Sequence, residues 1–331
     1  MKELTHLNKD AVQVSFDIPA DLQQEFTFVP GQYINLELLI NGKKERRSYS
    51  ICSGPNEPIA VAVKRVNKGI VSNFLNDQSS TDFPIWISKP EGNFKLDSAA
   101  KNIVCLAAGS GITPMLSMAK HLSSATKMHL FYGSQSKSTI LFEAELAALS
   151  SVECTHFLSK EEATGYEFGR LTKERFTEKI KENLQLLQAD AFYICGPSGL
   201  VADMQECLSF FGVSKEKIHI ELFTAAEIQE AVTSNDFTGE SQVKVMIDGE
   251  TASFTMKGEQ HSVLELAEKN GLDAPYSCRG GVCCSCRAKV LKGSAKMRSN
   301  FSLTDEEVKN GYILTCQAFP TSSELIVSFD E

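Results

Sequence analysis

Residues 278–286 read Cys-Arg-Gly-Gly-Val-Cys-Cys-Ser-Cys, and this stretch sets the expectation for the rest of the chain. Its first, sixth and ninth residues stand in C-x4-C-x2-C spacing, and a further cysteine follows later within Leu-Thr-Cys-Gln. Three thiolates on one short loop and a distant fourth are the ligand set of a [2Fe–2S] cluster. The expected ligands are Cys278, Cys283, Cys286 and Cys316.

The glycines of the loop fit this chemistry. Gly280 and Gly281 have no Cβ, so the backbone can turn tightly and point N–H groups at the sulfurs. Two alternatives compete. A structural zinc site usually has two C-x2-C pairs, and only one is present. A disulfide framework needs an oxidising compartment. Cys284 offers an alternative C-x-C ligand pair, although a small residue filling space explains it as well.

Length and charge limit the classes of protein to consider. The chain has 331 residues, which is enough for two or three domains. Its net charge is −9 and its sequence pI is about 5.3. An acidic balance argues against nucleic acid or an anionic membrane as the main partner.

The cysteine content points to a reducing compartment. The first residues lack the apolar run of a signal peptide, and no stretch approaches the roughly 20 apolar residues that span a bilayer. Ten cysteines without an export signal are expected to serve a metal, a cofactor or the core. We therefore expect a cytoplasmic protein that has no membrane partner.

Residues 1–98 predict a small antiparallel β-barrel. Val12–Phe16 and Tyr33–Leu38 alternate apolar and polar residues, as half-buried strands do. Asn41-Gly42 is typical of a hairpin turn. Several short strands broken by glycine and proline suit a barrel.

Residues 99–223 predict a doubly wound α/β domain with a parallel sheet. Continuous apolar runs indicate strands that are buried on both faces, and periodic segments between them indicate helices. The expected strands are Asn102–Ala108, Leu130–Tyr132, Val152–Leu158 and Ala191–Cys195, and the expected helices are Pro114–Ser123, Phe142–Leu149, Lys173–Leu187 and Leu200–Phe211.

The last part of the chain predicts a linker and an α+β domain. Residues 224–240 carry four acidic residues without a lysine or arginine, which is typical of a linker. In residues 241–331, two alternating segments flank Asp248-Gly249, a second hairpin signal. Ser262–Asn270 predicts a helix that Gly271 ends. The cluster loop follows, so we expect a ferredoxin-like domain.

A glycine-rich turn at the end of the first parallel strand predicts a dinucleotide site. Residues 106–114 read Leu-Ala-Ala-Gly-Ser-Gly-Ile-Thr-Pro. Glycines allow a pyrophosphate to approach the backbone closely, and the following helix presents its positive N-terminal end. Pro114 stands where a Rossmann fingerprint has its third glycine. A purely structural turn remains the alternative.

Three further motifs suit bound cofactors. Arg47-Ser48-Tyr49-Ser50 could pair an arginine with phosphate and lay a tyrosine against an aromatic ring. Gly69-Ile70-Val71-Ser72 could open a helix toward a second phosphate. Cys195-Gly196-Pro197 ends another parallel strand, at the edge where ligands bind. Taken singly, each could be a surface strand, a helix cap or a buried cysteine.

These motifs, in this order, resemble the ferredoxin–NADP reductase superfamily. The C-terminal cysteine loop and Gly311–Gln317 narrow the resemblance to oxygenase reductases with flavin, nicotinamide and ferredoxin modules. The resemblance covers nearly the whole chain. It implies an NAD(P)H-dependent flavin iron–sulfur oxidoreductase that passes electrons through FAD and a [2Fe–2S] cluster to an oxygenase.

The resemblance also implies roles for individual residues. Arg47 and Ser72 would bind the flavin diphosphate, Tyr49 would pack on the flavin and Ser50 would lie near its N5 atom. Cys195 and Glu221 would sit beside the reacting rings, so Ser50, Cys195 and Glu221 are the expected catalytic residues. The expected cofactor-binding residues are Arg47, Ser48, Tyr49, Ser50, Val63, Lys64, Gly69, Ser72, Gly109, Gly111, Thr113, Pro114, Gly196 and Pro197.

The most detailed expectations concern which nicotinamide cofactor donates the electrons and which oxygenase accepts them. Relatives often carry an arginine after Tyr-Gly-Ser for the 2′-phosphate of NADPH, and Gln135 stands there instead. Lys137, Lys160 or Arg170 could supply the positive charge, so NADPH is expected and NADH is the alternative. The resemblance is nearest to reductases of the di-iron phenylacetyl-CoA epoxidase of phenylacetate degradation. A Rieske-type or other aromatic or steroid oxygenase is one alternative, and a redox-sensing or scaffold subunit without turnover is another.

Overall fold

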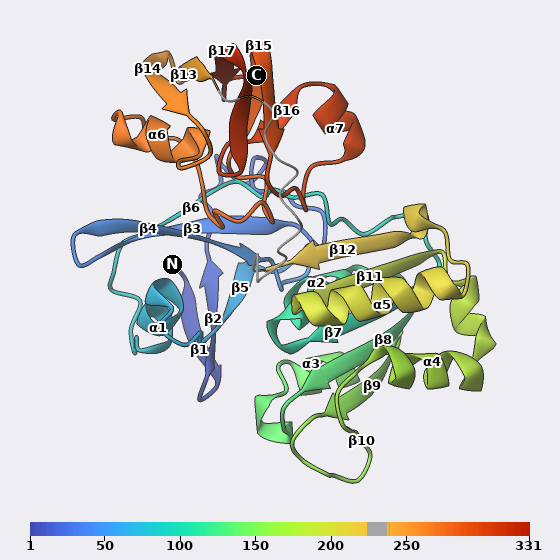
Figure 1. Cartoon of the computed structure of the whole chain (residues 1–331). Coiled ribbons are helices and arrows are strands. Elements are labelled where there is room, and N and C mark those ends of the chain that lie inside the picture. The colour runs from blue at the N-terminus through green and yellow to red at the C-terminus, as the bar shows by residue number, and fades with distance from the viewer. Residues whose placement is uncertain (224–236, 238) are drawn as a thin grey trace. The chain divides into compact units, whose positions relative to one another are not determined.

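A computed structural model describes residues 1–223, 237 and 239–331. The chain forms two compact units, Met1–Phe223 and Thr224–Glu331 (Figure 1). Of the expected linker over residues 224–240, residues 224–236 and 238 lie outside the described residues, and Glu240 already begins a strand. Among the described helices, none has both the length and the apolar character needed to cross a membrane.

The first unit opens with two antiparallel sheets of three strands each. One has the order β1-β2-β5 and the other β4-β3-β6. An isolated bridge between Ile51 and Val61 joins them where β4 gives way to β5. Their inward residues share one hydrophobic core. The strands are β1 (Glu3–Asn8), β2 (Ala11–Phe16), β3 (Tyr33–Ile40), β4 (Lys43–Ser50), β5 (Ile59–Lys64) and β6 (Ile85–Ile87).

The predicted hairpin in this region is confirmed. Ile40 pairs with Lys43, so Asn41 and Gly42 form a two-residue turn. Both have positive φ, 52° and 76°, as this kind of turn requires. The turn sets the register along β4 and places Ser50 opposite Tyr33.

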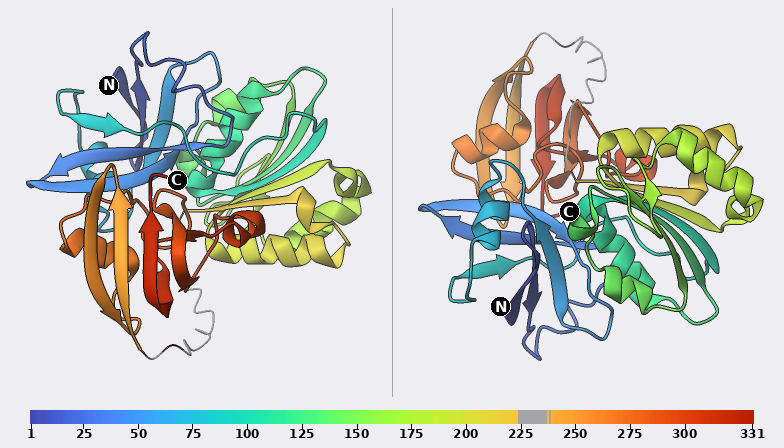
Figure 2. Two further views of the ribbon diagram at one scale, coloured as in Figure 1. Left: turned by 90° about the horizontal axis from the view of Figure 1, so that it is seen from above. Right: turned by 90° about the horizontal axis from the view of Figure 1, so that it is seen from below.

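The second half of the first unit is the predicted parallel sheet. Its order is β10-β9-β8-β7-β11-β12, with helices on both faces (Figures 1 and 2). The strands are β7 (Asn102–Ala108), β8 (Lys127–Ser134), β9 (Val152–Leu158), β10 (Glu167–Phe168), β11 (Ala191–Gly196) and β12 (Ile218–Leu222). The helices are α1 (Ile70–Asn76) in the barrel part, then α2 (Ile112–His121), α3 (Glu143–Ala147), α4 (Lys173–Glu182) and α5 (Ser198–Phe210).

One expected helix is shorter than predicted. The segment from Lys173 was expected to be helical to Leu187, but α4 ends at Glu182 and a 3₁₀ turn covers Leu184–Gln188. Asn183 leaves the helical conformation, and its side chain accepts a hydrogen bond from the Gln185 backbone N–H. Asparagine competes for backbone groups in this way, which favours a break over a continuous helix.

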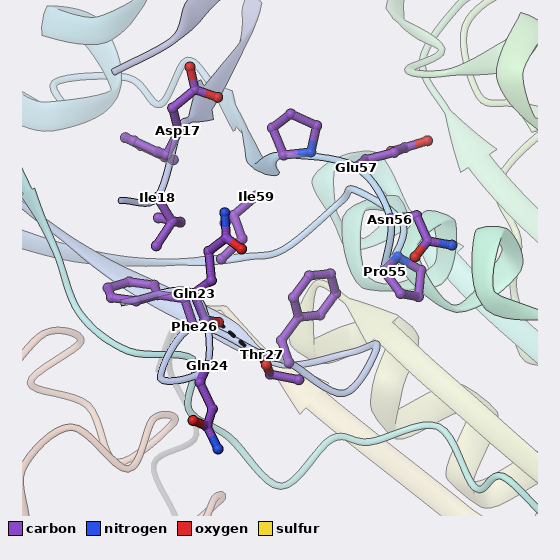
Figure 3. Close-up of a pocket in the computed structure, with 13 residues that line it drawn as sticks. Asp17, Ile18, Gln23, Gln24, Phe26, Thr27, Pro55, Asn56, Glu57 and Ile59 are labelled. Atoms are coloured by element: carbon purple, nitrogen blue, oxygen red, sulfur yellow. Dashed lines mark hydrogen bonds between the residues drawn. The ribbon is translucent and has the colours of Figure 1, made fainter. Parts of the chain in front are cut away.

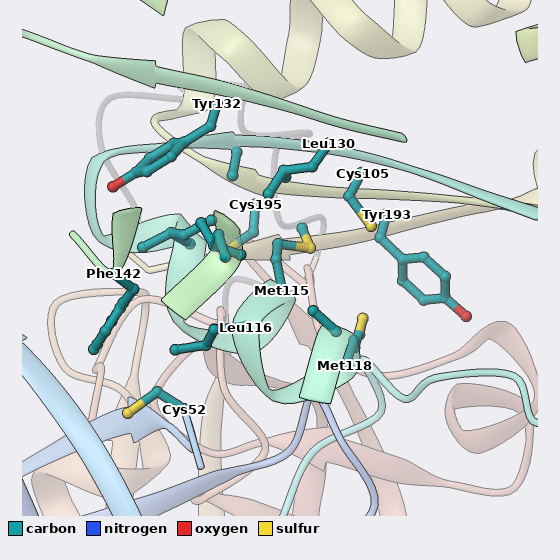
Figure 4. Packing of buried hydrophobic residues seen from close by; sticks show 14 of the residues in the cluster. Cys52, Cys105, Met115, Leu116, Met118, Leu130, Tyr132, Phe142, Tyr193 and Cys195 are labelled. Carbon is teal, nitrogen blue, oxygen red and sulfur yellow. The ribbon is translucent and has the colours of Figure 1, made fainter. Parts of the chain in front are cut away.

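Alternate residues of each central strand serve opposite faces. Cys105, Tyr193 and Cys195 belong to the core that α2 covers, as Figure 4 shows. Phe131 lies on the other face, where its ring meets the ring of Phe176 from α4 edge to face at 5.2 Å. Burial on both faces explains why these strands read as unbroken apolar runs.

The strand order marks the edge of this sheet where ligands bind in open α/β folds. From the central strand β7 the chain moves outward through β8 and β9, whereas β11 and β12 lie on the other side of β7. Helices that follow neighbouring strands to opposite sides leave a crevice at the carboxyl ends of β7 and β11. The glycine turn after Ala108 and the Cys195-Gly196-Pro197 turn both lie at this edge.

The second unit is a mixed sheet of order β14-β13-β17-β15-β16. Asp248 and Gly249 form the predicted hairpin turn with φ of 49° and 78°. Ser262 caps α6 in a reciprocal arrangement with Glu265, as predicted for a helix start. The elements are β13 (Glu240–Ile247), β14 (Glu250–Lys257), α6 (Val263–Lys269), β15 (Arg287–Met297), α7 (Asp305–Lys309), β16 (Tyr312–Leu314) and β17 (Ala318–Ser328).

The stability of the first unit is expected to fall at mildly acidic pH. The His219 ring stacks on Tyr193 at 4.8 Å, and burial lowers the pKa of His219 although Asp97 opposes the shift. The folded state therefore binds the proton less well than the unfolded state, where the pKa is about 6.5. The stabilisation is complete above that pKa and is lost as pH falls below it.

This expectation can be measured with the single tryptophan, Trp86, because it lies on β6 of the first unit. Urea unfolding followed by its fluorescence should give a lower free energy of unfolding at about pH 5.5 than at about pH 7.5. His219→Phe keeps the stack and should reduce this difference. An equal difference in both proteins would contradict the assignment to His219.

Candidate functional site

The three expected catalytic residues converge at the sheet edge. The Ser50 hydroxyl, at the end of β4, donates a hydrogen bond of 3.0 Å to Oε2 of Glu221 on β12. Cys195 pairs with Glu221 in the parallel register of β11 and β12. Residues that are far apart in the sequence thus bring a hydroxyl, a carboxylate and a thiol to one place.

Cys195 enters this site as a neutral thiol. Its side chain is fully buried in the core below α2. Burial raises the pKa of the Cys195 thiol well above its ordinary value, and the nearby Glu221 raises it further. The thiol therefore remains protonated at neutral pH and is no nucleophile.

The glycine turn lies directly against Cys195. Gly111 precedes α2, and a Cβ added to it would lie 2.6 Å from the Cys195 carbonyl carbon and closer still to its oxygen. Gly109 has φ of +57°, and a Cβ there would lie 3.5 Å from Nζ of Lys64. Glycine at these two positions therefore lets the ends of β7 and β11 approach closely, with the Lys64 ammonium group beside the turn. A glycine turn of this kind, placed before a helix, fits a pyrophosphate.

Other predicted residues of the turn support its shape. The Thr113 hydroxyl donates to the Ser110 carbonyl at 3.0 Å, and Pro114 is buried in α2. A Cβ on Gly196 would lie 3.3 Å from the Ala108 backbone nitrogen, which explains the glycine after Cys195. Pro197 precedes α5 and is exposed.

One residue of this site was missed by the sequence reasoning. The hydroxyl of Tyr132, on β8, donates to the Gly109 carbonyl at 3.1 Å and accepts from the Leu141 backbone N–H at 3.2 Å. Tyr132 is fully buried. A hydroxyl inside an otherwise apolar strand requires partners, and that requirement was the available signal.

In the Arg47–Ser50 motif, the arginine and the tyrosine lie toward the barrel. The two serines donate hydrogen bonds to Asn35 and Glu221. Tyr49 packs against the barrel core, and burial raises the pKa of its hydroxyl. Arg47 pairs with Glu45 on its own strand at 3.2 Å. The Ser48 hydroxyl donates to Oδ1 of Asn35 at 2.7 Å.

The second phosphate motif forms a closed turn before α1. The Ser72 hydroxyl accepts from the Val66 backbone N–H at 3.1 Å, and a Cβ on Gly69 would overlap that hydroxyl. Gly69 is therefore required by the position of Ser72. Val63 points into the barrel core, so only its backbone can contact a ligand.

A separate pocket of about 650 Å³ lies away from these residues (Figure 3). It is bounded by the ends of β2 and β5 at Phe16 and Ile59 and by the chain around Gln24. None of the residues predicted for catalysis or cofactor binding lines it. Its carboxylates are paired, because Asp17 contacts Lys2 at 3.2 Å and Glu57 contacts Lys120 at 3.0 Å.

In the second unit, the four predicted cluster ligands gather at one end of the sheet. The sulfurs of Cys278 and Cys283 lie 3.2 Å apart. The Cys316 thiol interacts with those of Cys278 and Cys286. Antiparallel pairing of Arg287 with Leu314 brings the last two ligands together, because each lies just beyond the paired strands.

The four thiols fit the ligand set of a two-iron cluster. Cys278 with Cys283 and Cys286 with Cys316 form two pairs, and each iron of such a cluster would take two protein ligands. None of the ten cysteines, all of which lie in the described part of the chain, forms a disulfide.

Backbone groups of the loop are directed at the sulfurs. The Gly280 N–H donates to Sγ of Cys278 at 3.3 Å. Gly281 has φ of +74°, and a Cβ there would lie 2.8 Å from the Ser299 carbonyl oxygen. Cys284 turns to a different neighbour, since its thiol donates to the Ser302 carbonyl at 3.5 Å.

The side chains considered for the 2′-phosphate lie beyond the ends of β8, β9 and β10. Nζ of Lys160 donates to Oε1 of Gln135 at 3.1 Å. The ammonium group of Lys137 lies 5.0 Å from the centre of the Tyr166 ring, and its backbone N–H donates to Glu161 at 2.8 Å. Arg170 is exposed.

Family models match three successive parts of the chain. They are an oxidoreductase FAD-binding domain over residues 1–96, an oxidoreductase NAD-binding domain over residues 105–206 and a 2Fe-2S iron-sulfur cluster binding domain over residues 245–321. The chain is 31% identical to one subunit of 1,2-phenylacetyl-CoA epoxidase from Escherichia coli (strain K12), over 97% of this chain and 94% of that protein. The chain belongs to the oxygenase reductases of the ferredoxin–NADP reductase superfamily.

Other reductases are similar along nearly the whole chain. This reductase is 28% identical to the ferredoxin reductase component of 3-ketosteroid-9-alpha-monooxygenase from Rhodococcus rhodochrous, over 97% of this chain and 93% of the relative. The solved structure of phthalate dioxygenase reductase covers 99% of this chain and 96% of its own, with a TM-score of 0.59 and 25% identity. The predicted multi-domain fold is confirmed.

The reductase is an NAD(P)H-dependent flavin iron–sulfur oxidoreductase with FAD, a pyridine nucleotide and a [2Fe–2S] cluster as cofactors. The glycine turn at Gly109 and Gly111, with Lys64 beside it, and the four gathered thiols fit these groups. When bound, FAD accepts an electron pair as hydride and the cluster carries single electrons, which is why both are needed.

Proposed function

We propose that this reductase supplies electrons to a di-iron phenylacetyl-CoA epoxidase. The supporting observation is the 31% identity to a subunit of 1,2-phenylacetyl-CoA epoxidase along nearly the whole of both chains. A steroid or other oxygenase is the second candidate, because the Rhodococcus relative is also similar over nearly its full length. Fold alone does not choose between partners.

Reconstitution separates these candidates. The purified reductase should support NAD(P)H-dependent epoxidation of phenylacetyl-CoA when it is mixed with the epoxidase, and should not support 3-ketosteroid hydroxylation. The reverse result would replace the proposed partner. A sensor or scaffold protein is distinguished from a reductase without any oxygenase, because it would not sustain steady-state oxidation of nicotinamide.

We propose that Ser50, Cys195 and Glu221 form the hydride-transfer site. The 3.0 Å hydrogen bond from Ser50 to Glu221 supports this role. The Glu221 carboxylate accepts the hydrogen bond of the Ser50 hydroxyl and so orients it. The neutral Cys195 thiol is buried beside Glu221 and adds no charge to the site. Hydride transfer is sensitive to such positioning of the reacting atoms.

Ser50→Ala is expected to slow nicotinamide-dependent reduction of the bound flavin roughly a hundredfold, and Glu221→Gln should have a similar effect, since misplacing the reacting groups by about 1 Å can cost this much. Stopped-flow absorbance under anaerobic conditions measures the rate. Because the two residues act as one unit, the double variant should be no slower than the worse single variant. Additive losses would show that they act separately.

We propose that Arg47, Lys64 and the Gly69–Ser72 turn hold the flavin diphosphate, while Tyr49 packs on the flavin ring. In that state Arg47 exchanges its pairing with Glu45 for the phosphate, which accepts two hydrogen bonds from a guanidinium. Gly109, Gly111, Thr113 and the Gly196-Pro197 turn would shape the nicotinamide-dinucleotide site.

NADPH is the proposed electron donor, with NADH as the second candidate. Lys137 and Lys160 lie on the segments that follow β8 and β9, where they can supply charge for a 2′-phosphate. Lys160→Gln should therefore raise the KM for NADPH more than that for NADH. An unchanged ratio of the two KM values would rule out this role.

The remaining proposals concern domain limits and location. We place the flavin domain at residues 1–98, the nicotinamide domain at 99–223, the linker at 224–239 and the ferredoxin domain at 240–331, one residue earlier than expected because β13 begins at Glu240. The connection between β6 and β7 contains the first limit, and the described first unit ends at Phe223. The free thiols require a reducing compartment, which we propose is the cytoplasm.

A further inference from the structure

The first residue after the first cluster ligand has an unusual backbone conformation. Arg279 has φ of +52°, in the left-handed region that favours glycine. The next two residues are glycines, which adopt positive φ without strain, yet position 279 is an arginine. A non-glycine residue keeps such a conformation only when its surroundings impose it.

The side chain of Arg279 supplies that constraint. Its guanidinium donates to both carboxylate oxygens of Glu268 on α6, at 2.9 and 2.7 Å. The same group lies over the ring of Tyr276 at 3.8 Å from the ring centre. A fork-like ion pair stacked on an aromatic ring fixes both position and orientation. The loop is therefore tied to α6 at this residue.

The backbone of Arg279 connects the two parts of the ligand set. Its carbonyl accepts a hydrogen bond of 2.9 Å from Nε2 of Gln317, the residue that follows ligand Cys316. The next N–H along the chain, that of Gly280, points at Sγ of Cys278 at 3.3 Å. The direction of this N–H depends on the peptide between Arg279 and Gly280, and so on the conformation of Arg279.

We propose that Arg279 is a positioning residue for the iron–sulfur cluster, held by Glu268 and Tyr276. It presets the first turn of the loop so that the Gly280 N–H meets the Cys278 sulfur and Gln317 stays beside Cys316. This inference rests on the assignment of Cys278 and Cys316 as cluster ligands. Outer groups that orient ligands in this way tune both metal retention and reduction potential.

The contacts indicate that Arg279 acts through geometry more than through charge. Glu268 neutralises the guanidinium at hydrogen-bonding distance. Arg279→Lys keeps the charge but loses the fork and the planar stack. Arg279→Gly removes the side chain but tolerates the left-handed backbone, whereas Arg279→Ala removes the side chain and keeps the strain. Glu268→Gln weakens the same tie from α6 without altering the loop sequence.

The test compares these variants in the full-length protein, purified anaerobically. The readouts are the rate of cluster loss to an iron chelator, the electron paramagnetic resonance spectrum of the reduced cluster and its midpoint potential. Glu268→Gln and Arg279→Gly should lose the cluster roughly ten times faster than the unaltered chain, because outer-shell changes weaken metal binding by about tenfold or more. Arg279→Ala should be fastest, and both Glu268→Gln and Arg279→Gly should shift the spectrum in the same direction.

Two outcomes would overturn the proposal. One is an unaltered rate and spectrum in Glu268→Gln and Arg279→Gly. The other is a normal rate and spectrum in Arg279→Lys alone among the Arg279 variants, since that would assign the effect to charge. If Arg279→Ala fails to fold, Glu268→Gln still decides the question. Absence of two irons from the unaltered chain would instead remove the ligand assignment itself, so the two failures can be told apart.

Discussion

Cys283→Ser is expected to abolish the [2Fe–2S] cluster, whereas Cys284→Ser, one residue further on, is expected to leave it in place. The Cys283 sulfur lies 3.2 Å from that of Cys278, within the group of four thiols. The Cys284 thiol points to the Ser302 carbonyl instead. Loss of one of four thiolates removes a bond to iron that a hydroxyl replaces poorly.

Iron and sulfide content, together with the spectrum of the reduced protein, measure this effect. Cys283→Ser should contain almost no cluster but should still reduce its flavin with NAD(P)H, because the flavin and nicotinamide domains belong to the first unit. Cys284→Ser should retain two irons per chain. A cluster that survives in Cys283→Ser and is lost in Cys284→Ser would show that the C-x-C pair supplies the ligands.

Gly111→Ala is expected to disable the nicotinamide site. The added Cβ would lie 2.6 Å from the Cys195 carbonyl carbon, and it would lie 3.1 Å from the Gly196 nitrogen. Backbone atoms cannot yield as a flexible side chain can, so the ends of β7 and β11 must separate. Overpacking of this kind costs about 1–3 kcal/mol, and the displaced turn should lower kcat/KM for NAD(P)H roughly a hundredfold.

Gly199→Ala is the matched control. Gly199 lies in α5, close to the same sheet edge, and a Cβ there would meet nothing within 4 Å. Alanine in a helix is more stable than glycine by up to about 1 kcal/mol, so this variant should unfold at the same temperature or slightly higher. Normal kinetics in Gly111→Ala would show that the close approach to Cys195 is not essential.

Local features of the fold could be predicted because they depend on few residues. Asn41-Gly42 and Asp248-Gly249 specify their hairpins through backbone freedom alone. The apolar runs around Val104 and Ile194 predicted strands buried on both faces, and the cysteine spacing predicted the ligand set. Each of these signals lies within a short window of sequence.

The details of the site could not be predicted, because they arise from contacts between distant segments. The residue pattern alone did not indicate that Ser50 forms a hydrogen bond with Glu221. Only the family resemblance predicted that both residues lie near the reacting rings. The bond from Tyr132 to Gly109 and the pairing of Arg279 with Glu268 depend on register and helix position. A pattern of residue types contains no information on these distances. The break at Asn183 was missed for a local reason, since capping by asparagine competes with an otherwise helical pattern.

The central claim is that one chain receives electron pairs from a nicotinamide cofactor and releases them singly through its iron–sulfur cluster. An anaerobic titration with NADPH, and separately with NADH, tests it most directly when flavin and cluster absorbance are followed together. We expect that both chromophores are reduced in each competent titration, and that Cys283→Ser loses only the cluster signal. Reduction of the flavin without reduction of an intact cluster in the unaltered protein would contradict the claim.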